Sequence, residues 1–388
     1  MTATGHERNQ SAKAHVKREP LFHVSKRDRI PLWKSITIRA VAILAALLLS
    51  GILTIFLTGE NPLAVYKYYF VGAFGSSFKV WNTLQGTAIL LGIALALTPA
   101  YKMRFWNTGA EGQVLIGCLA TAFIMWKVGG TVPDGLLIPL MLLSALAAGI
   151  LWGVLPAICK AQWGTNETLF TLMMNYVAIQ LVECFLKVAD KTGSNTVGPN
   201  LLKNGWLPKL GGQDYLLNIL VVAVLTVIVY VYLKYSKHGY EISVVGESEN
   251  TARYIGINVK KVIIRTMVLS GALCGLMGFL LVAGTSHSID SNLVDGRGFT
   301  AIMVAWMAKF NPFFMVLASL LLVFLDKGAS EVSTRFGLNQ DYSEIVTGII
   351  LFFLIGCEFF MNYQIHINKS RLPARWRKEA VADKKEVQ

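Results

Sequence analysis

The sequence predicts an all-helical protein with many membrane-spanning segments, because of its composition and the length of its apolar runs. Of its 388 residues, 54% are hydrophobic and 15% are charged, and the mean hydropathy is +0.51. These values lie outside the range of soluble domains. A helix needs about 20 apolar residues to cross a bilayer, where each segment must satisfy its own backbone hydrogen bonds. We therefore expect an all-α polytopic membrane protein with about ten transmembrane helices.

Ten apolar windows meet or approach this length. They cover residues 36–57, 80–101, 104–127, 135–158, 166–188, 214–235, 262–285, 297–310, 312–327 and 342–364. The eighth and ninth windows are short and are separated by Lys309, Phe310, Asn311 and Pro312. This stretch is either a tight turn between two helices or a break in one long helix, so the sequence leaves nine and ten helices open.

Basic residues are concentrated at the two ends of the chain. Residues 1–35 are expected to form one basic tail, residues 36–364 the transmembrane domain, and residues 365–388 a second basic tail. The first tail is too long for a cleaved signal, and no small-residue cleavage site follows the first apolar run. Because positive charge accumulates on the cytosolic side, we expect both termini in the cytosol. The net charge of +13 then reflects topology and contact with lipid headgroups rather than nucleic-acid binding.

Motifs for catalysis or nucleotide binding are missing from the sequence. No Gly-x-x-x-x-Gly-Lys-Ser/Thr stretch is present, and the five cysteines and six histidines show no metal-ligand spacing. No Ser/His/Asp set or carboxylate pair emerges either. We therefore expect a non-catalytic chain without a cofactor or metal of its own, and any ATP must be bound by another chain.

Two groups of polar residues interrupt the apolar windows. In FWNTGAEGQVLIG (residues 105–117), Asn107 and Glu111 are four residues apart and share a helical face. An ionised Glu within a membrane helix costs about 2.5–3.5 kcal/mol, so it requires a partner, water or protonation. Glu111 is accordingly a helix anchor or cap, a hydrogen-bonding hub, or part of a polar path. In GTNETLFTLMMNY (residues 164–176), Glu167, Thr171 and Asn175 form a stripe that should face a cavity or another helix.

Smaller signals accompany these groups. Asn166 is a candidate N-cap for the helix that carries the stripe. The polar segment 236–261 lies on the cytosolic side by its charge, and a short helix within it should end at Gly256, which suits a left-handed stop. Glycines at small-xxx-small spacing should allow close helix packing. They are Gly149 and Gly153 in one window, and Gly271, Gly275 and Gly278 in another.

Four motifs in order resemble the membrane permeases of ATP-binding-cassette importers for branched-chain amino acids, ribose and other simple sugars, and nucleosides, most closely the nucleoside type. FWNTGAEGQ is similar to the family's F-N-I-G-A-E-G-Q, and TNETLFTLMMNY to its N-E-x-x-x-T-L-M-x-N-Y. The other two are GYEISVVGESENTARYIGINV (residues 239–259) and GRGFTAIMVAWMAKFNP (residues 296–312). Two places depart from the family pattern. The change at Thr251 bears on docking of the partner subunit, and the change at Trp306–Lys309 bears on the choice of solute.

The resemblance implies a permease subunit that forms the path for a nucleoside or simple sugar by alternating access. Its partners would be a nucleotide-binding subunit that holds ATP and Mg, a second homologous permease and an extracellular solute-binding lipoprotein, all at a bacterial inner membrane. Residues expected to couple to the nucleotide-binding subunit are Glu249, Ala252, Arg253 and Gly256. Candidates for the path are Asn107, Glu111, Glu167, Thr171 and Asn175, and candidates for contact with the binding protein are Asp290, Asp295 and Arg297.

The same residues also allow a purely structural interpretation and a different transport mechanism. The stripe with Glu167 could serve only to hold two helices together. The loops with the candidate binding-protein contacts could be ordinary solvent-exposed loops. A proton- or ion-coupled secondary transporter acting alone is the alternative function, and it would use Glu111 or Glu167 as its ion site. The coupling-type loop at 236–261 favours the importer.

Overall fold

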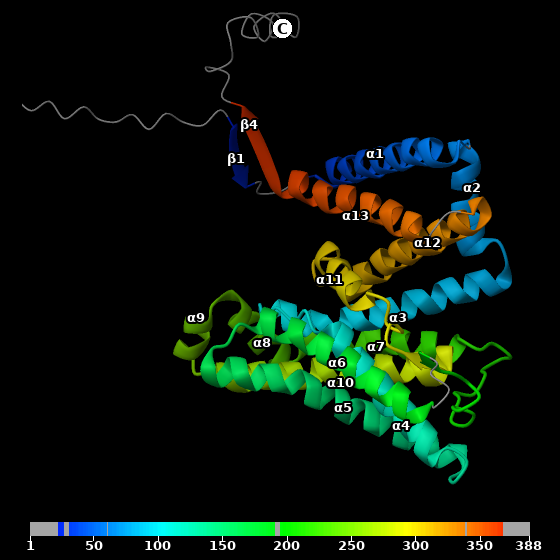
Figure 1. Cartoon of the computed structure of the whole chain (residues 1–388). Coiled ribbons are helices and arrows are strands. Elements are labelled where there is room, and N and C mark those ends of the chain that lie inside the picture. Colours follow the sequence, from blue (N-terminus) through cyan, green and yellow to red (C-terminus); the bar gives the residue numbers. More distant parts are fainter. Residues whose placement is uncertain (1–21, 27–30, 60, 191–194, 338–339, 368–388) are drawn as a thin grey trace, which may run out of the picture. The chain divides into compact units, whose positions relative to one another are not determined.

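The computed structural model describes residues 22–26, 31–59, 61–190, 195–337 and 340–367 (Figure 1). Its contacts divide the chain into a larger unit, Ser50–Gly348, and a smaller unit formed by Met1–Leu49 with Ile349–Gln388. Most of the two predicted basic tails, residues 1–21, 27–30 and 368–388, lies outside the described residues.

The larger unit consists almost entirely of helices. They are α2 (Pro62–Phe74), α3 (Ser77–Lys102), α4 (Ala110–Val128), α5 (Asp134–Trp163), α6 (Glu167–Ala189), α7 (Leu216–Tyr235), α8 (Lys237–Glu247), α9 (Glu249–Tyr254), α10 (Val259–Leu281), the π-helix η1 (Val282–Ser286), α11 (Arg297–Met307) and α12 (Pro312–Phe336). Two short strands, β2 (Thr196–Val197) and β3 (Ile289–Asp290), pair antiparallel and join the loops after α6 and η1.

The smaller unit contains the ends of two long helices and a strand pair. Helices α1 (Leu32–Thr58) and α13 (Gln340–Asn362) each extend from one unit into the other. Strand β1 (Phe22–Lys26) pairs antiparallel with β4 (Tyr363–Ile367), so that Phe22 lies opposite Ile367. Sequence analysis did not foresee this pairing, because both strands fall in or beside the segments expected to be tails.

Within the described residues, seven helices are long and apolar enough to cross a membrane: α3, α4, α5, α6, α7, α10 with η1, and α12. Two further apolar stretches, Ala40–Phe56 in α1 and Ile345–Met361 in α13, are shorter. Together with α11 they account for the ten predicted windows. The expected all-helical membrane architecture is confirmed.

Helix α10 lies at the centre of the larger unit, where it packs against α3, α4 and α5. The predicted glycines form its contact surfaces. Gly271 faces the backbone of Gly149 on α5, Gly275 faces the Ala145 carbonyl of α5, and Gly278 faces the Val114 carbonyl of α4. A side chain at any of these positions would overlap a neighbouring main chain. The small-residue packing expected from the sequence is therefore present.

The structure also resolves the ambiguous region before α12. Helix α11 has 11 residues, which at 1.5 Å per residue is about 16 Å, roughly half of a hydrocarbon core. A tight turn follows, in which Lys309 and Phe310 take left-handed φ angles of 49° and 59°. Asn311 then caps α12, because its Oδ1 accepts a hydrogen bond from Phe313 N at 3.1 Å. The region is thus two helices joined by a turn, the first of them half-length.

Helix α2 was not expected, since its 13 residues are too few to cross a bilayer. Asn61 caps it, with its Oδ1 accepting from Leu63 N at 3.0 Å, and proline occupies the first helical position. The helix packs along α12, where Gly72 and Gly328 allow the two backbones to approach closely. Sequence windows chosen for membrane length cannot detect such a helix.

A substitution of Gly275 tests the central packing. We expect Gly275→Val to destabilise the protein by about 1–3 kcal/mol or more, because the added carbons would force α10 away from α4 and α5. The measurement is the apparent melting temperature in a mild detergent. Gly135→Ala on α5 is the matched control, since nothing lies within 4 Å of an added Cβ there. Equal melting temperatures for the two variants would contradict the packing role.

Candidate functional site

The residues before α4 form a buried turn that is organised by Asn107. This side chain is completely buried. Its Oδ1 accepts a hydrogen bond from Gly109 N at 3.0 Å, and its Nδ2 donates to Gln113 Oε1 at 3.3 Å. The Tyr101 hydroxyl, at the end of α3, donates to the Asn107 carbonyl at 3.1 Å. Asn107 therefore fixes the direction in which the chain enters α4.

Glu111, in the first turn of α4, holds the beginning of α11. Its Oε1 accepts a hydrogen bond from Gly296 N at 2.9 Å, and its Oε2 accepts from Gly298 N at 2.7 Å. The first N–H groups of a helix have no partner within it, and a carboxylate there is also favoured by the helix dipole. Gly298 lets the two backbones meet, because an added Cβ would collide with Glu111. Glu111 thus caps a helix, although not its own.

The polar stripe of α6 faces the beginning of α4. Asn175 Oδ1 accepts a hydrogen bond from Gly112 N at 2.8 Å, and Asn175 Nδ2 donates to the Thr108 carbonyl at 2.9 Å. Thr171 Oγ1 accepts from Thr108 N at 3.1 Å. The stripe residues are buried. These bonds join the two helix starts.

At the N-terminal end of this stripe, Glu167 forms an ion pair with Lys160 of α5 at 2.8 Å. The predicted cap is confirmed, since Asn166 Oδ1 accepts from Thr168 N at 3.0 Å and from Leu169 N at 3.2 Å. The sequence-predicted path residues Asn107, Thr171 and Asn175 therefore meet at one junction, while Glu111 reaches α11. Their assignment to a solute path stays a prediction.

The predicted coupling segment contains two short helices, α8 and α9. Ser248 separates them and caps α9, with its Oγ accepting from Thr251 N at 3.2 Å. Glu249 and Arg253 form an exposed ion pair at 3.2 Å, and the neighbouring Tyr254 is 93% exposed. Ala252 is fully buried beneath them. Gly256 takes a φ of +84° with open space around it, which is the left-handed geometry expected of a helix stop.

Helix α8 is fastened to the transmembrane helices at two places. Gly246 packs directly on the carbonyl of Lys102, at the end of α3. Glu241 accepts a hydrogen bond from the Arg265 guanidinium of α10 at 2.7 Å. The exposed surface of α9 is therefore rigidly linked through α8 to α3 and α10.

The three predicted binding-protein contacts lie along the segment between η1 and α11. Asp290 belongs to β3, and its Oδ1 accepts from Asn292 N at 2.8 Å. Asp295 is exposed and has a left-handed φ of 55°, and Arg297 is the first residue of α11. Asp295 and Arg297 flank Gly296, whose N–H is bound by Glu111. Glu111, a candidate for the solute path, therefore lies next to two of the candidates for contact with the binding protein, Asp295 and Arg297.

A ring stack that the sequence did not reveal joins the loops at this end. His287 lies on Trp206 with ring centroids 4.1 Å apart, and Leu207 N donates to the Ala283 carbonyl at 2.9 Å. Burial lowers the pKa of His287, so its imidazole is neutral at neutral pH. Sequence spacing could not predict this stack, because the tryptophan lies 81 positions before the histidine. The histidine also takes a left-handed backbone conformation, which the sequence does not show.

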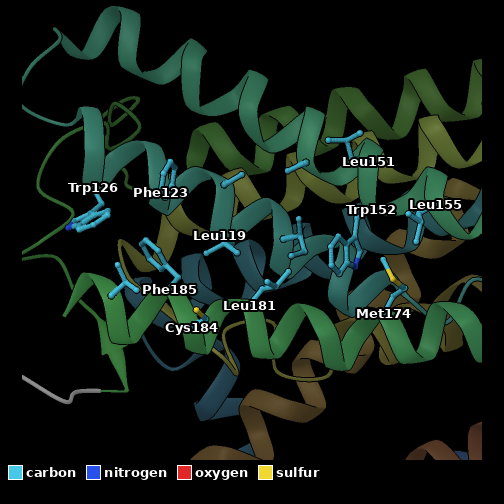
Figure 2. Close-up of a pocket in the computed structure, with 14 residues that line it drawn as sticks. Leu119, Phe123, Trp126, Leu151, Trp152, Leu155, Met174, Leu181, Cys184 and Phe185 are labelled. Atoms are coloured by element: carbon cyan, nitrogen blue, oxygen red, sulfur yellow. The ribbon is translucent and has the colours of Figure 1, made fainter. Parts of the chain in front are cut away.

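A large pocket between α4, α5 and α6 has apolar walls (Figure 2). Its volume is about 920 Å³, and its lining includes Leu119, Trp126, Trp152, Leu181 and Phe185. No charged side chain lines it. It therefore suits hydrocarbon, and it differs from the polar surface that a hydrophilic solute requires.

Comparisons with known proteins place these features in a family. Residues 79–355 match the family model described as branched-chain amino acid transport system, permease component. A glucose ABC transporter permease of Haloferax volcanii is 30% identical, over 89% of this chain and 94% of its own. A guanosine ABC transporter permease of Bacillus subtilis is 31% identical, over 79% and 89% respectively. A nucleoside ABC transporter permease of Lactococcus lactis is 28% identical, over 83% and 91%.

Substitutions of Glu111 test its capping role. We expect Glu111→Ala to destabilise the protein by about 1–3 kcal/mol, because Gly296 N and Gly298 N lose their acceptor. Glu111→Gln retains one acceptor oxygen and should lie between wild type and alanine. The measurements are thermal stability in detergent and hydrogen exchange at these two amides, with exposed Glu247→Ala as control. Unchanged exchange at Gly296 and Gly298 in the alanine variant would exclude the cap.

Proposed function

Since the chain belongs to the family of branched-chain amino acid transport system permease components, we propose that it forms the membrane path for a nucleoside or a simple sugar. It is a permease subunit of an ATP-driven importer and has no catalytic activity, and ATP hydrolysis takes place in a partner subunit. The solute class is supported by the relatives named for glucose, guanosine and nucleosides. Glucose and guanosine both carry a sugar ring with vicinal hydroxyl groups.

The mechanism rests on one observation: the exposed surface of α9 is attached through α8 to the transmembrane helices α3 and α10. Tyr254 and the Glu249–Arg253 pair project from a helix that is tied through α8 to α3 and α10. ATP can drive alternating access only if the ATP-binding subunit holds the conformations of the permease with different affinities. A docking surface that is fixed to the transmembrane helices transmits such a difference. Ala252 supports this surface from beneath, and Gly256 ends it.

The family implies an ATP-binding subunit and a substrate-binding protein as partners. The finer arrangement is our proposal. ATP and Mg are held by the partner subunit, a second homologous permease completes the path, and an extracellular lipoprotein delivers the solute to the segment with Asp290, Asp295 and Arg297. The cell membrane is the site of action, with α8, α9 and both termini in the cytosol, in accord with the basic charge of these segments.

Neither carboxylate suggested for an ion-coupled transporter is free. Glu111 accepts two backbone hydrogen bonds and Glu167 is paired with Lys160. A proton or ion site needs a group that can exchange its partner during the cycle. Both carboxylates therefore suit helix attachment better than ion coupling.

Purification of the tagged chain from its native cells in a mild detergent tests the assembly. We expect an ATP-binding subunit and a second permease to accompany it in mass spectrometry. The complex, reconstituted in vesicles with its binding protein, should take up a nucleoside or glucose only when ATP is supplied. Proton-driven uptake by the purified chain alone would contradict the proposal.

Replacement of the exposed tyrosine of α9 tests the docking surface. We expect Tyr254→Ala to reduce solute-stimulated ATP hydrolysis at least tenfold, because a fully exposed aromatic anchor at an interface commonly contributes 2 kcal/mol or more, about a 30-fold effect. Solute-stimulated hydrolysis by the purified complex is the measurement. Tyr363→Ala, at an exposed tyrosine of β4, is the control. Wild-type stimulation in Tyr254→Ala would remove α9 from the interface.

A further inference from the structure

A second polar stripe runs along α12, and unlike that of α6 it is exposed. Asp326, Ser330 and Thr334 follow one another at spacings of four residues and therefore share one face of the helix. All three side chains are exposed on the surface of the chain. Thr334 Oγ1 donates to the Ser330 carbonyl at 2.9 Å.

This face points away from the helix that covers α12 on its other side. Helix α2 contacts α12 through Phe324, Gly328 and Glu331. Asp326 is two residues from both Phe324 and Gly328, which at 3.6 residues per turn places it about 200° around the helix from each. Asp326 is thus on the side of α12 opposite α2, and Ser330 and Thr334 follow about 40° and 80° further around the helix.

Asp326 lies on a helix that is long and apolar enough to cross a membrane. It is the fifteenth of the 25 residues of this helix. At 1.5 Å per residue it lies about 21 Å from the first residue and about 15 Å from the last. Among the residues that the structure describes, no hydrogen bond or ion pair engages its carboxylate. Hydrocarbon cannot accept such a group without a large cost, so this face must meet water or a polar partner.

The segment that begins α11 carries two further charged residues, Asp295 and Arg297. Arg297 and Asp295 are within electrostatic reach of Asp326. Neither side chain has a hydrogen bond or ion pair within the described ranges, and the backbone between them is held by Glu111. Lys327, the next residue after Asp326, is half-buried and about 100° away around the helix. The guanidinium and the second carboxylate at the start of α11 therefore interact with Asp326 through space.

We propose that the stripe of Asp326, Ser330 and Thr334 lines the solute path and that the Asp326 carboxylate binds vicinal hydroxyl groups of the solute's sugar ring. This inference rests on the proposed function. An ionised carboxylate only accepts hydrogen bonds, and its two oxygens match two adjacent hydroxyl donors. The Arg297 guanidinium has further donors for ring and hydroxyl oxygens. A site built in this way rejects analogues that lack the hydroxyls.

Cysteine labelling tests whether the stripe faces water, independently of transport. Ser330→Cys and Thr334→Cys are made in a chain whose more accessible Cys159 and Cys184 are serine, and the assembled complex is placed in vesicles. We expect a charged methanethiosulfonate to label both positions, and saturating nucleoside or glucose to slow the labelling. Leu317→Cys, nine residues before Asp326 on the opposite face of α12, is the control and should stay unlabelled. Unlabelled stripe positions would mean a dry contact with the partner permease and would overturn the proposal.

Asp326→Asn tests the recognition of hydroxyls. With the binding protein and ATP supplied, we expect KM for a nucleoside to rise tenfold or more. The preference for a nucleoside over its 2′,3′-dideoxy analogue should fall by a similar factor. Glu183→Gln, at a half-buried carboxylate of α6 outside the stripe, is the matched control.

The outcomes separate this inference from the proposed function. If wild type imports the nucleoside with ATP and Asp326→Asn keeps its KM and its discrimination, hydroxyl binding by Asp326 is wrong and the importer stands. If wild type imports neither nucleoside nor glucose, the solute class is wrong and hydroxyl recognition falls with it. Labelling still decides in that case whether the stripe faces water.

Discussion

A polar group inside a bilayer has no water to bond, and this constraint organises the larger unit of the chain. Each carboxylate or amide of the sequence-predicted site meets a specific partner: Glu111 binds two amides of α11, Asn175 binds the start of α4, and Glu167 pairs with Lys160. The helices are thereby attached at their ends, where the backbone itself lacks partners. Along their lengths they need no polar attachment, because glycines allow main chains to pack directly.

The same constraint distinguishes residues that hold the fold from residues that can meet a solute. The stripe of α6 is buried and its hydrogen bonds stay within the protein, whereas the stripe of α12 is exposed and its carboxylate has no hydrogen-bond or ion-pair partner among the residues that the structure describes. Both have the same four-residue spacing. What differs is whether another helix of the same chain covers them. In a permease, an exposed polar face on a membrane-spanning helix is a candidate for the path or for contact with a partner, since lipid covers such a face at a cost.

Composition and spacing predicted the membrane windows, the capping residue Asn166, the stop at Gly256 and the glycine contacts, because all of these depend on local chemistry. The partner of Glu111 could not be predicted, since Gly296 and Gly298 are far away in sequence and two backbone amides leave no side-chain signature. The α12 stripe was missed for another reason. The apolar window there ends at residue 327, so Ser330 and Thr334 fell outside it and Asp326 was the last residue but one within it. Helix α2 and the two strand pairs lack any membrane-length signal.

The attachment of α11 to α4 also bears on how the protein is made. Gly296 follows Glu111 by 185 positions. At about 5–20 residues per second, ribosomes need roughly 10–40 s to synthesise the intervening chain. During that interval α4 is already available for insertion while its carboxylate lacks its final partners, so it must stay protonated, hydrated or shielded by the insertion machinery. Helix α11, too short to cross a membrane by itself, then arrives at an acceptor that is already in place, before α12 and α13 are synthesised.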